Sequence, residues 1–501
     1  MDKNEGTRLA PVDIAVIGAG IAGLSAAVFA RMKGYSIRVF EQHSLPGGLC
    51  TSWKRKGFVF DYSVDFLFGS QPVQGFHSLW KELGLLDATH FRHIDAFGEY
   101  QDLEGQRFSL YTDPARLERH AVEISPQDRA AIHRFCTALG RIRSFLPTRL
   151  GFSLRDVPAV LSSLPSLIEV SRWTRKSVLQ WSSQLHSPFL RQAIPVIAGP
   201  DTPMAALLLV MGMMNRDGAA CPLGGSLRLA QAIEAHAKSL GVELRYNSRV
   251  SGIAYSSGMV SGLRLADGSF QPVRALVSAC DLHHLFRDLL DDAIHVPEYE
   301  SLFEAGRLYD PVVQVSIGVR LDPDWQLETR PHNLHLPAAA GIRVGPKTER
   351  MMMLRHYAYD ASMAPEGCTS LIVRFATDFD WWKSMNRTPD AYRAEKESLL
   401  EAVISALELH LPGLRSRIEA CDVATPLSAV RYTSVWRGST QGWLLTTELM
   451  KQAMAGRTLP VSLPGISNMA LAGQWTEPGG GIPPAARSGK SAALYLASRL
   501  G

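Results

Sequence analysis

Apolar and polar positions at the start of the chain follow the order strand, helix, strand. Residues 14–17 form an apolar run, an alanine-rich helical stretch follows and reaches about Lys33, and residues 36–40 form a second apolar run. Such a pattern predicts a βαβ unit of a doubly wound α/β fold.

The turn between the first strand and the helix contains Gly18-x-Gly20-x-x-Gly23. The first glycine permits a tight turn, the second lets a pyrophosphate approach the backbone, and the third lets the helix pack on the strand. The helix N-terminus would offer free N–H groups to the phosphates. Glu41, at the end of the second strand, would accept hydrogen bonds from ribose hydroxyls. The simpler alternative is a glycine-rich turn in an ordinary βαβ unit.

Two further glycine clusters point to the same kind of ligand. Gly47 and Gly48 follow the second strand and mark another place where the backbone passes close to a cofactor. Gly479-Gly-Gly481 lies between a strand expected over 469–472 and a helix expected over 485–500, so a helix dipole would face negative charge there. A nicotinamide site is normally completed within one Rossmann unit. Signals at both ends of the chain therefore favour FAD over NAD, because the isoalloxazine ring extends beyond the dinucleotide.

The middle of the chain predicts a second domain. Glycine signals fade between about residues 91 and 220, where segments 129–145, 156–170 and 177–197 have helical spacing. Trp173, Trp181, Phe189 and the run 204–214 would line an apolar pocket or, more commonly for such residues, pack between helices. Further on, the pattern predicts strands over 311–319, 351–359 and 370–377 and a helix over 389–409.

Residues 221–279 return to an α/β pattern. It predicts a helix over 227–240 capped by Ser226, and strands over 242–246, 250–255, 260–265 and 274–279. We therefore expect an α/β protein with a discontinuous Rossmann-like FAD-binding domain formed by residues 10–90, 221–305 and 466–501. The remaining residues, 91–220 and 306–465, would form an α+β substrate domain with a mixed sheet and a helical insert.

Composition limits the remaining possibilities. The chain has 501 residues, a net charge of +4 and 46% hydrophobic residues, which indicates a folded protein with more than one domain and no nucleic-acid-binding face. The six cysteines are scattered without a C-x-x-C pair, so we expect free thiols, a reducing compartment and no metal site. No signal peptide is expected at the N-terminus, and the apolar run 204–214 is too short to span a bilayer. We expect a cytoplasmic protein, with peripheral membrane contact through residues 150–170 left open beside simple helix packing.

Several motifs occur in a family order along the chain: Ile17-Gly-Ala-Gly-Ile-Ala-Gly-Leu24, Pro46-Gly-Gly48, Gly57-Phe-Val-Phe-Asp61, Pro222-Leu-Gly-Gly225, Val277-Ser-Ala279 and Ala472-Gly-Gln-Trp-Thr-Glu-Pro-Gly-Gly-Gly-Ile-Pro-Pro484 with Ser488-Gly489. With them the chain resembles the phytoene desaturase and carotenoid isomerase family of FAD-dependent oxidoreductases, which includes retinol saturase-like enzymes. The first motif is shared by many flavoproteins, whereas the last is much more specific.

The resemblance implies an FAD enzyme that desaturates, saturates or isomerises carbon–carbon bonds of an apolar, often polyene, substrate. The expected cofactor-binding residues are Gly18, Gly20, Ile21, Ala22, Gly23, Glu41, Gln42, Gly47, Gly48, Val250, Gly473, Gly480, Gly481 and Ile482. The substrate, the direction of the reaction and the external electron acceptor are not indicated by these motifs.

Two positions depart from the family pattern. Relatives often carry a histidine where this chain has Glu477, and many place Gly and His where it has Ser63 and Asp65. Glu477 and Asp65 are therefore candidate proton carriers near the flavin. The alternatives are that Glu477 caps a helix start and that Asp65 is an exposed loop acid. Either carboxylate would also argue against a plain hydrocarbon substrate.

Two other functions remain open at this point. A flavin-dependent amine or amino-acid oxidase would need an aromatic cage or an arginine clamp, for which Arg355 and Arg437 are unassigned. A protein that only binds a prenyl or lipid chain would not need the C-terminal glycines.

Further candidates for a channel wall are Tyr432, Trp436, Trp443 and His356, whose aromatic rings could equally serve packing.

Overall fold

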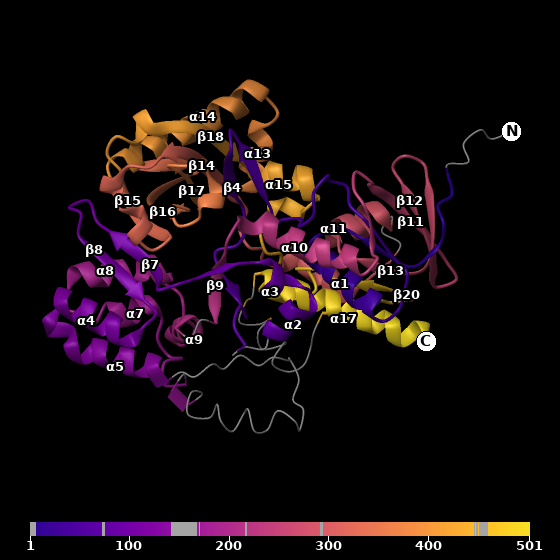
Figure 1. The fold of residues 1–501 in the computed structure, drawn as a ribbon, viewed down its shortest axis with the longest axis horizontal. Helices are drawn as coiled ribbons and strands as arrows, with labels where there is room; N and C mark the ends of the chain where they lie inside the picture. The colour runs from indigo at the N-terminus through magenta and orange to yellow at the C-terminus, as the bar shows by residue number, and fades with distance from the viewer. Residues whose placement is uncertain are drawn as a thin grey trace.

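The computed structural model describes residues 7–72, 76–141, 168–169, 171–215, 218–290, 294–444, 446, 449 and 459–501. Two large sheets lie toward opposite ends of the molecule, with helices around each (Figure 1). The chain passes between them several times, so each sheet contains strands that are far apart in sequence.

The first sheet has the strand order β10-β2-β1-β13-β12-β11, and β20 also pairs with β13. Its strands are β1 (Val12–Ile17), β2 (Ile37–Phe40), β10 (Glu243–Arg245), β11 (Val250–Ser256), β12 (Met259–Leu265), β13 (Phe270–Ser278), β19 (Ser462–Leu463) and β20 (Ile466–Leu471). β1 runs parallel to β2 and β13, and β20 runs parallel to β13. The carboxyl ends of these parallel strands therefore meet at one edge of the sheet, where α/β proteins bind ligands.

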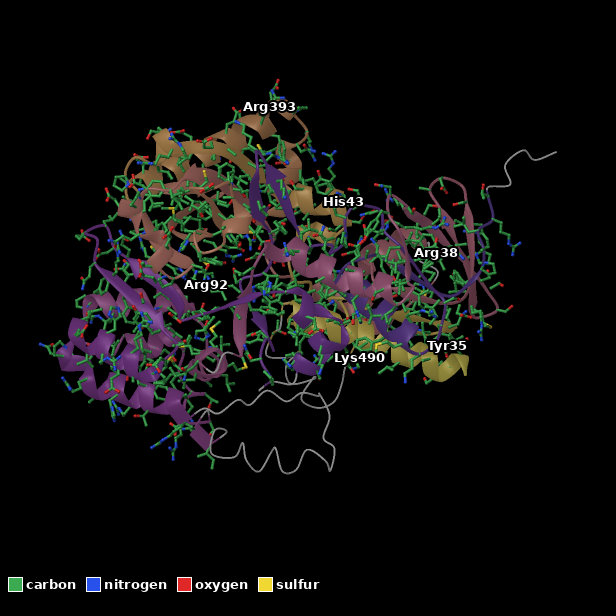
Figure 2. All side chains as sticks on the ribbon, viewed as in Figure 1. Tyr35, Arg38, His43, Arg92, Arg393 and Lys490 are labelled. Atoms are coloured by element: carbon green, nitrogen blue, oxygen red, sulfur yellow. The ribbon has the colours of Figure 1, made fainter. Side chains whose placement is uncertain are left out.

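The first and the last helix of the chain pack against each other beside this sheet. They are α1 (Ile21–Met32) and α17 (Ile482–Leu500), coloured indigo and yellow (Figure 1). The Ser25 hydroxyl donates to the Ala486 carbonyl at 2.6 Å. Tyr35 and Lys490 lie along the C-terminal helix (Figure 2), where they bond to Ala497 and Glu82. The helix α10 (Gly225–Ser239) also packs on α1, with α2 (Phe76–Glu82) and α3 (Leu85–Ala88) nearby.

The second sheet has the order β18-β14-β17-β16-β15-β7-β8. Its strands are β7 (Ala96–Gln101), β8 (Arg107–Tyr111), β14 (Val312–Arg320), β15 (Asn333–Val344), β16 (Lys347–His356), β17 (Cys368–Ala376) and β18 (Ile418–Ala424). The helices α13 (Phe379–Met385) and α14 (Pro389–Glu408) contribute Trp382, Leu399 and Val403 to its core. β15 pairs with β7 in parallel, which joins segments that are more than two hundred residues apart.

A group of helices packs at the β7–β8 end of this sheet (Figure 1). It contains α4 (Pro114–Ile124), α5 (Arg129–Arg141), α7 (Val178–Ser182), α8 (Pro188–Ala198) and α9 (Met204–Met214). Trp181 is buried in this core, with Trp173 and Phe189 partly buried against it. The segments 150–170 and 156–170, for which membrane contact and a helix were considered, lie almost wholly outside the described residues. Within the described part, no helix combines the length and the apolarity needed to cross a bilayer.

Short elements connect the two sheets. They are the hairpin β3 (Ser52–Arg55) and β4 (Phe58–Asp61), the small sheet of β5 (Leu67–Phe68), β9 (Ala219–Pro222) and β6 (Phe91–His93), and the helices α11 (Leu282–His284), α12 (Pro297–Ala305) and α15 (Pro426–Thr433). The hairpin packs on β17 and β18 of the second sheet, although it belongs in sequence to the first predicted domain. The domain boundaries themselves stay a prediction.

Most predicted elements are present, and two local predictions were wrong. The helix expected over 177–197 is divided into α7 and α8, because Pro188 and its N-cap Ser187 start a new helix. Ser226 lies inside α10 and does not cap it; the N-cap is Gly224, which has a left-handed φ of 89°. The Ser226 hydroxyl instead donates to the buried Asp61 carboxylate at 3.0 Å. All six cysteines are unpaired, as expected.

Candidate active site

A cavity of about 1150 Å³ lies at the carboxyl edge of the first sheet and extends toward the second. This volume is above the roughly 300–1000 Å³ that is usual for small-ligand pockets. Its wall includes residues from both ends of the chain, among them Gly20, Gly48, Gly473 and Gly481. The two glycine signals that the sequence places far apart therefore border one space.

The two N-terminal glycine turns touch each other across the cavity wall. Gly20 and Gly47 form an isolated parallel bridge, and the Gly47 N–H donates to the Ala19 carbonyl at 2.8 Å. A Cβ on Gly48 would lie 3.5 Å from the Gly20 Cα and would enter the space between the turns. A ligand can therefore approach bare backbone here, as a pyrophosphate requires.

Gly23 has a different position from its neighbours. It is not among the residues that line the cavity, and a Cβ on it would lie 1.9 Å from the Gly18 carbonyl oxygen. Gly23 therefore allows the close packing of helix and turn that the motif predicts, without a position in the wall.

Two helix N-termini border the cavity without a side-chain cap. The N-cap of α1 is Gly20 and that of α17 is Gly481; neither first turn contains an acid. The first N–H groups of a helix have no partner inside it and carry partial positive charge, so each end suits a negative group. The Gly480 N–H was expected to face the ligand, but it donates to the Glu477 carbonyl at 3.3 Å. At this end Gly481 and Ile482 are the better candidates for contact with a ligand.

Glu41 lines the cavity and also holds the first glycine turn. Its carboxylate accepts hydrogen bonds from the Ala19 N–H and the His43 N–H, each at 2.8 Å. Burial raises the pKa of this carboxyl, while the two backbone N–H groups oppose the shift. The predicted neighbours Gln42 and Val250 lie in the same wall.

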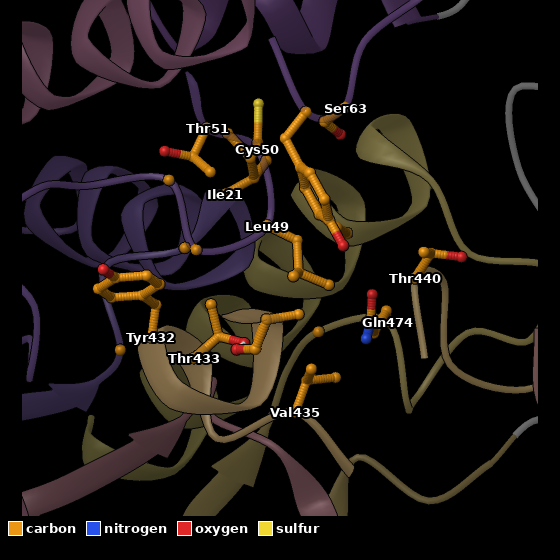
Figure 3. Close-up of a pocket in the computed structure, with 18 of the residues that line it drawn as sticks. Ile21, Leu49, Cys50, Thr51, Ser63, Tyr432, Thr433, Val435, Thr440 and Gln474 are labelled. Carbon is orange, nitrogen blue, oxygen red and sulfur yellow. Dashed lines mark hydrogen bonds between the residues drawn. The ribbon is translucent and has the colours of Figure 1, made fainter. Parts of the chain in front are cut away.

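The end of α15 and the residues that follow it form the opposite wall, of which only Tyr432 was a candidate from the sequence. Tyr432, Thr433 and Val435 lie across the cavity from Ile21 and Cys50 (Figure 3). The Gln42 side chain donates to the Tyr432 carbonyl at 3.0 Å, which ties this segment to the end of β2. The only earlier signal was the aromatic ring of Tyr432 itself.

Asp281 is a second wall residue that the sequence did not identify. It follows β13, and its carboxylate accepts hydrogen bonds from the Trp436 N–H at 2.8 Å and the His284 N–H at 3.0 Å. Burial raises its pKa to about 6. This carboxyl links the first sheet to the segment that faces it.

The two predicted proton carriers occupy different environments. Asp65 lines the cavity and forms an ion pair with the buried guanidinium of Arg355. Glu477 is not among the lining residues and forms an ion pair with Arg487 at 2.5 Å. Asp65 is thus a partly exposed loop acid that is held by this pair. The cap considered for Glu477 is replaced by a bond to a side chain of α17. Their catalytic roles stay predictions.

Beside Asp65 the wall contains a network of buried polar groups around Asp61. The Asp61 carboxylate accepts hydrogen bonds from the Ser226 N–H at 2.7 Å and from the Tyr357 hydroxyl at 3.3 Å. Arg374 of β17 donates to the Asp61 backbone carbonyl at 3.1 Å and to the Gln314 amide oxygen at 2.7 Å. Tyr62 and Arg374 line the cavity, whereas Asp61 lies behind it.

The wall near Asp65 is otherwise apolar. It includes Phe66, Phe68, Phe76 and Met213. The other aromatic candidates pack away from it: Trp436 and Trp443 belong to a cluster with Trp475 and Phe303, and His356 is fully buried with a bond to the Pro331 carbonyl. Of these candidates, only Tyr432 lines the cavity.

The family described as flavin containing amine oxidoreductase matches residues 21–496, which is nearly the whole chain. The chain belongs to this family. It is an FAD-dependent oxidoreductase, and the paired glycine turns and uncapped helix ends fit a dinucleotide with a negatively charged ring edge. Oxidised or reduced FAD supplies hydride transfer when bound.

Individual relatives extend over the same length at low identity. The chain is 23% identical to the phytoene desaturase (lycopene-forming) of Pantoea ananas, over 95% of this chain and 97% of that protein. It is 24% identical to the chloroplastic prolycopene isomerase of Daucus carota, over 98% of this chain and 80% of that protein. The resemblance noted from the motifs is confirmed.

Solved structures show the same fold. An oxidoreductase from Methanosarcina mazei matches with a TM-score of 0.59 at 16% identity, over 96% of this chain and 99% of that one. Putrescine oxidase bound to putrescine matches with a TM-score of 0.59 at 14% identity, over 98% and 100%. At this identity the likeness concerns the two-sheet FAD-binding fold alone.

Proposed function

We propose that this oxidoreductase desaturates, saturates or isomerises a carbon–carbon bond of an apolar, polyene-like small molecule. The observation that carries the proposal is the cavity: one space bordered by the glycine turns continues into a wall of Phe66, Phe68, Phe76 and Met213. Aromatic and thioether side chains suit a long unsaturated chain, because they offer apolar contact without demanding hydrogen bonds. Similarity to phytoene desaturases and prolycopene isomerases supports the same substrate class.

The proposal assigns FAD to named parts of the wall. The turn of Gly18 and Gly20, with the N-terminus of α1, would hold the pyrophosphate, and Glu41 would lie near the ribose. Gly481 and Ile482 at the start of α17 would lie near the ring and stabilise negative charge on it through their N–H groups. Glu41 would also keep the first turn in shape, since it bonds to the Ala19 N–H.

Asp65 is the better of the two candidate proton carriers. It lies in the cavity wall beside the aromatic residues, and its ion pair with Arg355 fixes the position of the carboxylate. Glu477 instead connects the last glycine turn to Arg487 on α17, so we propose that it positions that turn. A polyene can spread charge along its chain, so an acid or base is needed at only one position.

An amine substrate is disfavoured by the charges in the wall. Arg374 and Lys396 line the cavity, and the Asp65 carboxylate that could attract an amine is already paired with Arg355. Glu41 and Asp281 also line the cavity, but both carboxylates already accept backbone hydrogen bonds, so a protonated amine beside Arg374 would find no unpaired carboxylate in the described part of the wall. The structural likeness to putrescine oxidase, at 14% identity, concerns the fold and gives no support for that substrate.

The test uses the purified holoprotein. It should be yellow, absorb at about 450 nm as oxidised flavins do, and bleach when dithionite reduces it. Polyene hydrocarbons supplied in detergent micelles should be converted to products with more, fewer or rearranged double bonds, detected by chromatography with absorbance. Di- and monoamines supplied in parallel should release no peroxide. Peroxide from an amine, with every polyene unchanged, would overturn the proposal.

A further inference from the structure

The cavity wall contains a cation and a hydroxyl for which the described part of the protein provides no matching partner. Arg374 has no carboxylate within ion-pair distance among the described residues; its acceptors are the Gln314 amide oxygen and the Asp61 backbone carbonyl, both uncharged. The Tyr62 hydroxyl is buried and has no hydrogen-bond partner there either. A buried hydroxyl without a partner and a buried cation without a counter-charge both cost stability, so Tyr62 would gain from an acceptor and Arg374 from an anion.

These two groups lie together. The Arg374 guanidinium carbon is 5.5 Å from the centre of the Tyr62 ring, and both residues line the cavity. The backbone holds both in place: the Tyr62 N–H donates to the Thr51 carbonyl at 3.0 Å, and Arg374 is paired with Gln314 across β17 and β14. A ligand group beside the guanidinium would therefore also lie near the Tyr62 side chain.

At neutral pH the Tyr62 hydroxyl and the Arg374 guanidinium are both protonated and can donate hydrogen bonds. Burial raises the pKa of Tyr62, so the hydroxyl keeps its proton. Burial and the neighbouring Arg355 lower the pKa of Arg374 to about 10, so the guanidinium stays charged at neutral pH. Both can then donate to a ligand that accepts hydrogen bonds, and the guanidinium has no acceptor of its own.

Neighbouring acids do not neutralise this cation directly. Asp65 is paired with Arg355, and the Asp61 carboxylate is bonded to Ser226 and Tyr357. The same cavity is also lined by the apolar residues Phe66, Phe68, Phe76 and Met213. The site thus joins an apolar region to a pair of donors.

We propose that the substrate is an apolar chain with a carboxylate at one end, and that Arg374 and Tyr62 anchor this carboxylate. Guanidinium and carboxylate pair in a fork, and the hydroxyl adds a second donor, which would orient the chain along the apolar wall. The inference rests on the proposed function, because it specifies the substrate class for that reaction. A plain hydrocarbon would leave the Tyr62 hydroxyl without an acceptor and Arg374 without an anion.

The test measures binding to the holoprotein by the change in flavin absorbance. The probes are a C20 all-trans polyene carboxylic acid, its methyl ester and the polyene hydrocarbon of the same length. The acid should bind roughly 10- to 100-fold more tightly than the ester, as expected for hydrogen bonds to a charged group. Arg374→Gln should abolish the preference for the acid, and Arg374→Lys should retain part of it, because the charge remains without the fork. Tyr62→Phe should weaken binding of both acid and ester by a similar factor, because the ester also accepts a hydrogen bond.

Arg343→Gln is the matched control, since Arg343 lies on the same sheet but pairs with Glu395 outside the cavity wall. It should leave the preference unchanged. Equal binding of acid and ester to the unaltered protein, or an acid preference that survives Arg374→Gln, would overturn the inference. A lower flavin reduction potential in Arg374→Gln without a change in ligand preference would overturn it too, because the cation would then serve the flavin.

The two proposals fail in different ways. Conversion of the hydrocarbon, with no preference for the acid, would leave the proposed function in place and remove the anchor. An Arg374-dependent preference for the acid, with no polyene converted, would keep the anchor and remove the proposed carbon–carbon chemistry.

Discussion

The crossing of the first and last helices offers the sharpest test of how this fold builds its cofactor site. At the crossing, a Cβ on Gly489 of α17 would lie 2.1 Å from the Ala22 carbonyl oxygen, 2.8 Å from the Ala26 nitrogen and 2.9 Å from the Ser25 Cβ. Carbon and carbonyl oxygen meet at roughly 3.3 Å. Gly489→Ala therefore requires the two helix backbones to separate by about 1 Å.

Two opposing effects set the change in the free energy of unfolding of Gly489→Ala. Overpacking of this kind costs about 1–3 kcal/mol, and replacement of glycine by alanine inside a helix returns about 1 kcal/mol. Because backbone atoms form the contact, a small side-chain movement cannot relieve it, and the cost lies in the upper part of this range, about 2–3 kcal/mol. After the gain of about 1 kcal/mol, we expect net destabilisation of about 1–2 kcal/mol. The shift would also move Gly481 and Ile482 at the start of α17, and loss of one charged hydrogen bond there weakens FAD binding by about 10-fold.

The assay compares Gly489→Ala with Gly140→Ala. Gly140 also lies inside a helix, α5, but a Cβ on it would have only the Pro114 Cγ within 4 Å, at 3.8 Å. The control should gain roughly 0.5–1 kcal/mol from helix propensity alone. Urea unfolding of both variants and FAD titration of their apoproteins give the two quantities. If Gly489→Ala were stabilised like the control and bound FAD normally, the close crossing would not hold the cofactor site together.

Three further predictions concern the cavity wall. Gly48→Ala should lower FAD affinity about 10-fold or more in an equilibrium titration, because its methyl group enters the space beside Gly20. Gly367 has a similar left-handed φ of 69° but open surroundings, so the control Gly367→Ala should cost only backbone strain. Burial raises the pKa of the Asp281 carboxyl from 3.8 to about 6, so the unfolded chain loses this proton first as the pH rises. The free energy of unfolding should therefore fall by up to about 3 kcal/mol between pH 4 and 6. Asp281→Asn should flatten this pH dependence, as measured by urea unfolding. Asp65→Asn removes the ion-pair partner of the buried Arg355 guanidinium, so we expect about 1–3 kcal/mol of destabilisation. We also expect a loss of turnover. Unchanged turnover would assign Asp65 to structure alone.

Local patterns were sufficient for the elements around the first glycine turn. Apolar residues in β1 and β2, the glycine spacing and the alanine-rich α1 all depend on neighbours within a few residues, and the predicted and observed bounds agree closely. The predicted cofactor positions other than Gly23 also line one cavity, since a turn that exposes bare backbone must do so wherever the chain places it.

Pairing between distant segments could not be predicted in this way. The β7 strand lies beside β15 through a parallel pairing of Leu334 with Glu99, and neither strand was identified from its own pattern. Ser226 was expected to cap a helix, but it bonds to Asp61, which is far away in sequence. Such contacts depend on which chain segments meet, and period and propensity carry no information about that.

The sequence by itself determined that two glycine-rich helix starts exist and that each would suit negative charge, because backbone freedom and the helix dipole are local properties. Only the tertiary structure decided that they share one cavity and that Glu477 is paired with Arg487. It also decided that Tyr62, whose hydroxyl has no partner among the described residues, and Arg374, which has no carboxylate partner there, line this cavity. The reason is physical: a side chain's partner is set by three-dimensional proximity, and here Gly20 and Gly481, like Tyr62 and Arg374, are hundreds of residues apart in the chain.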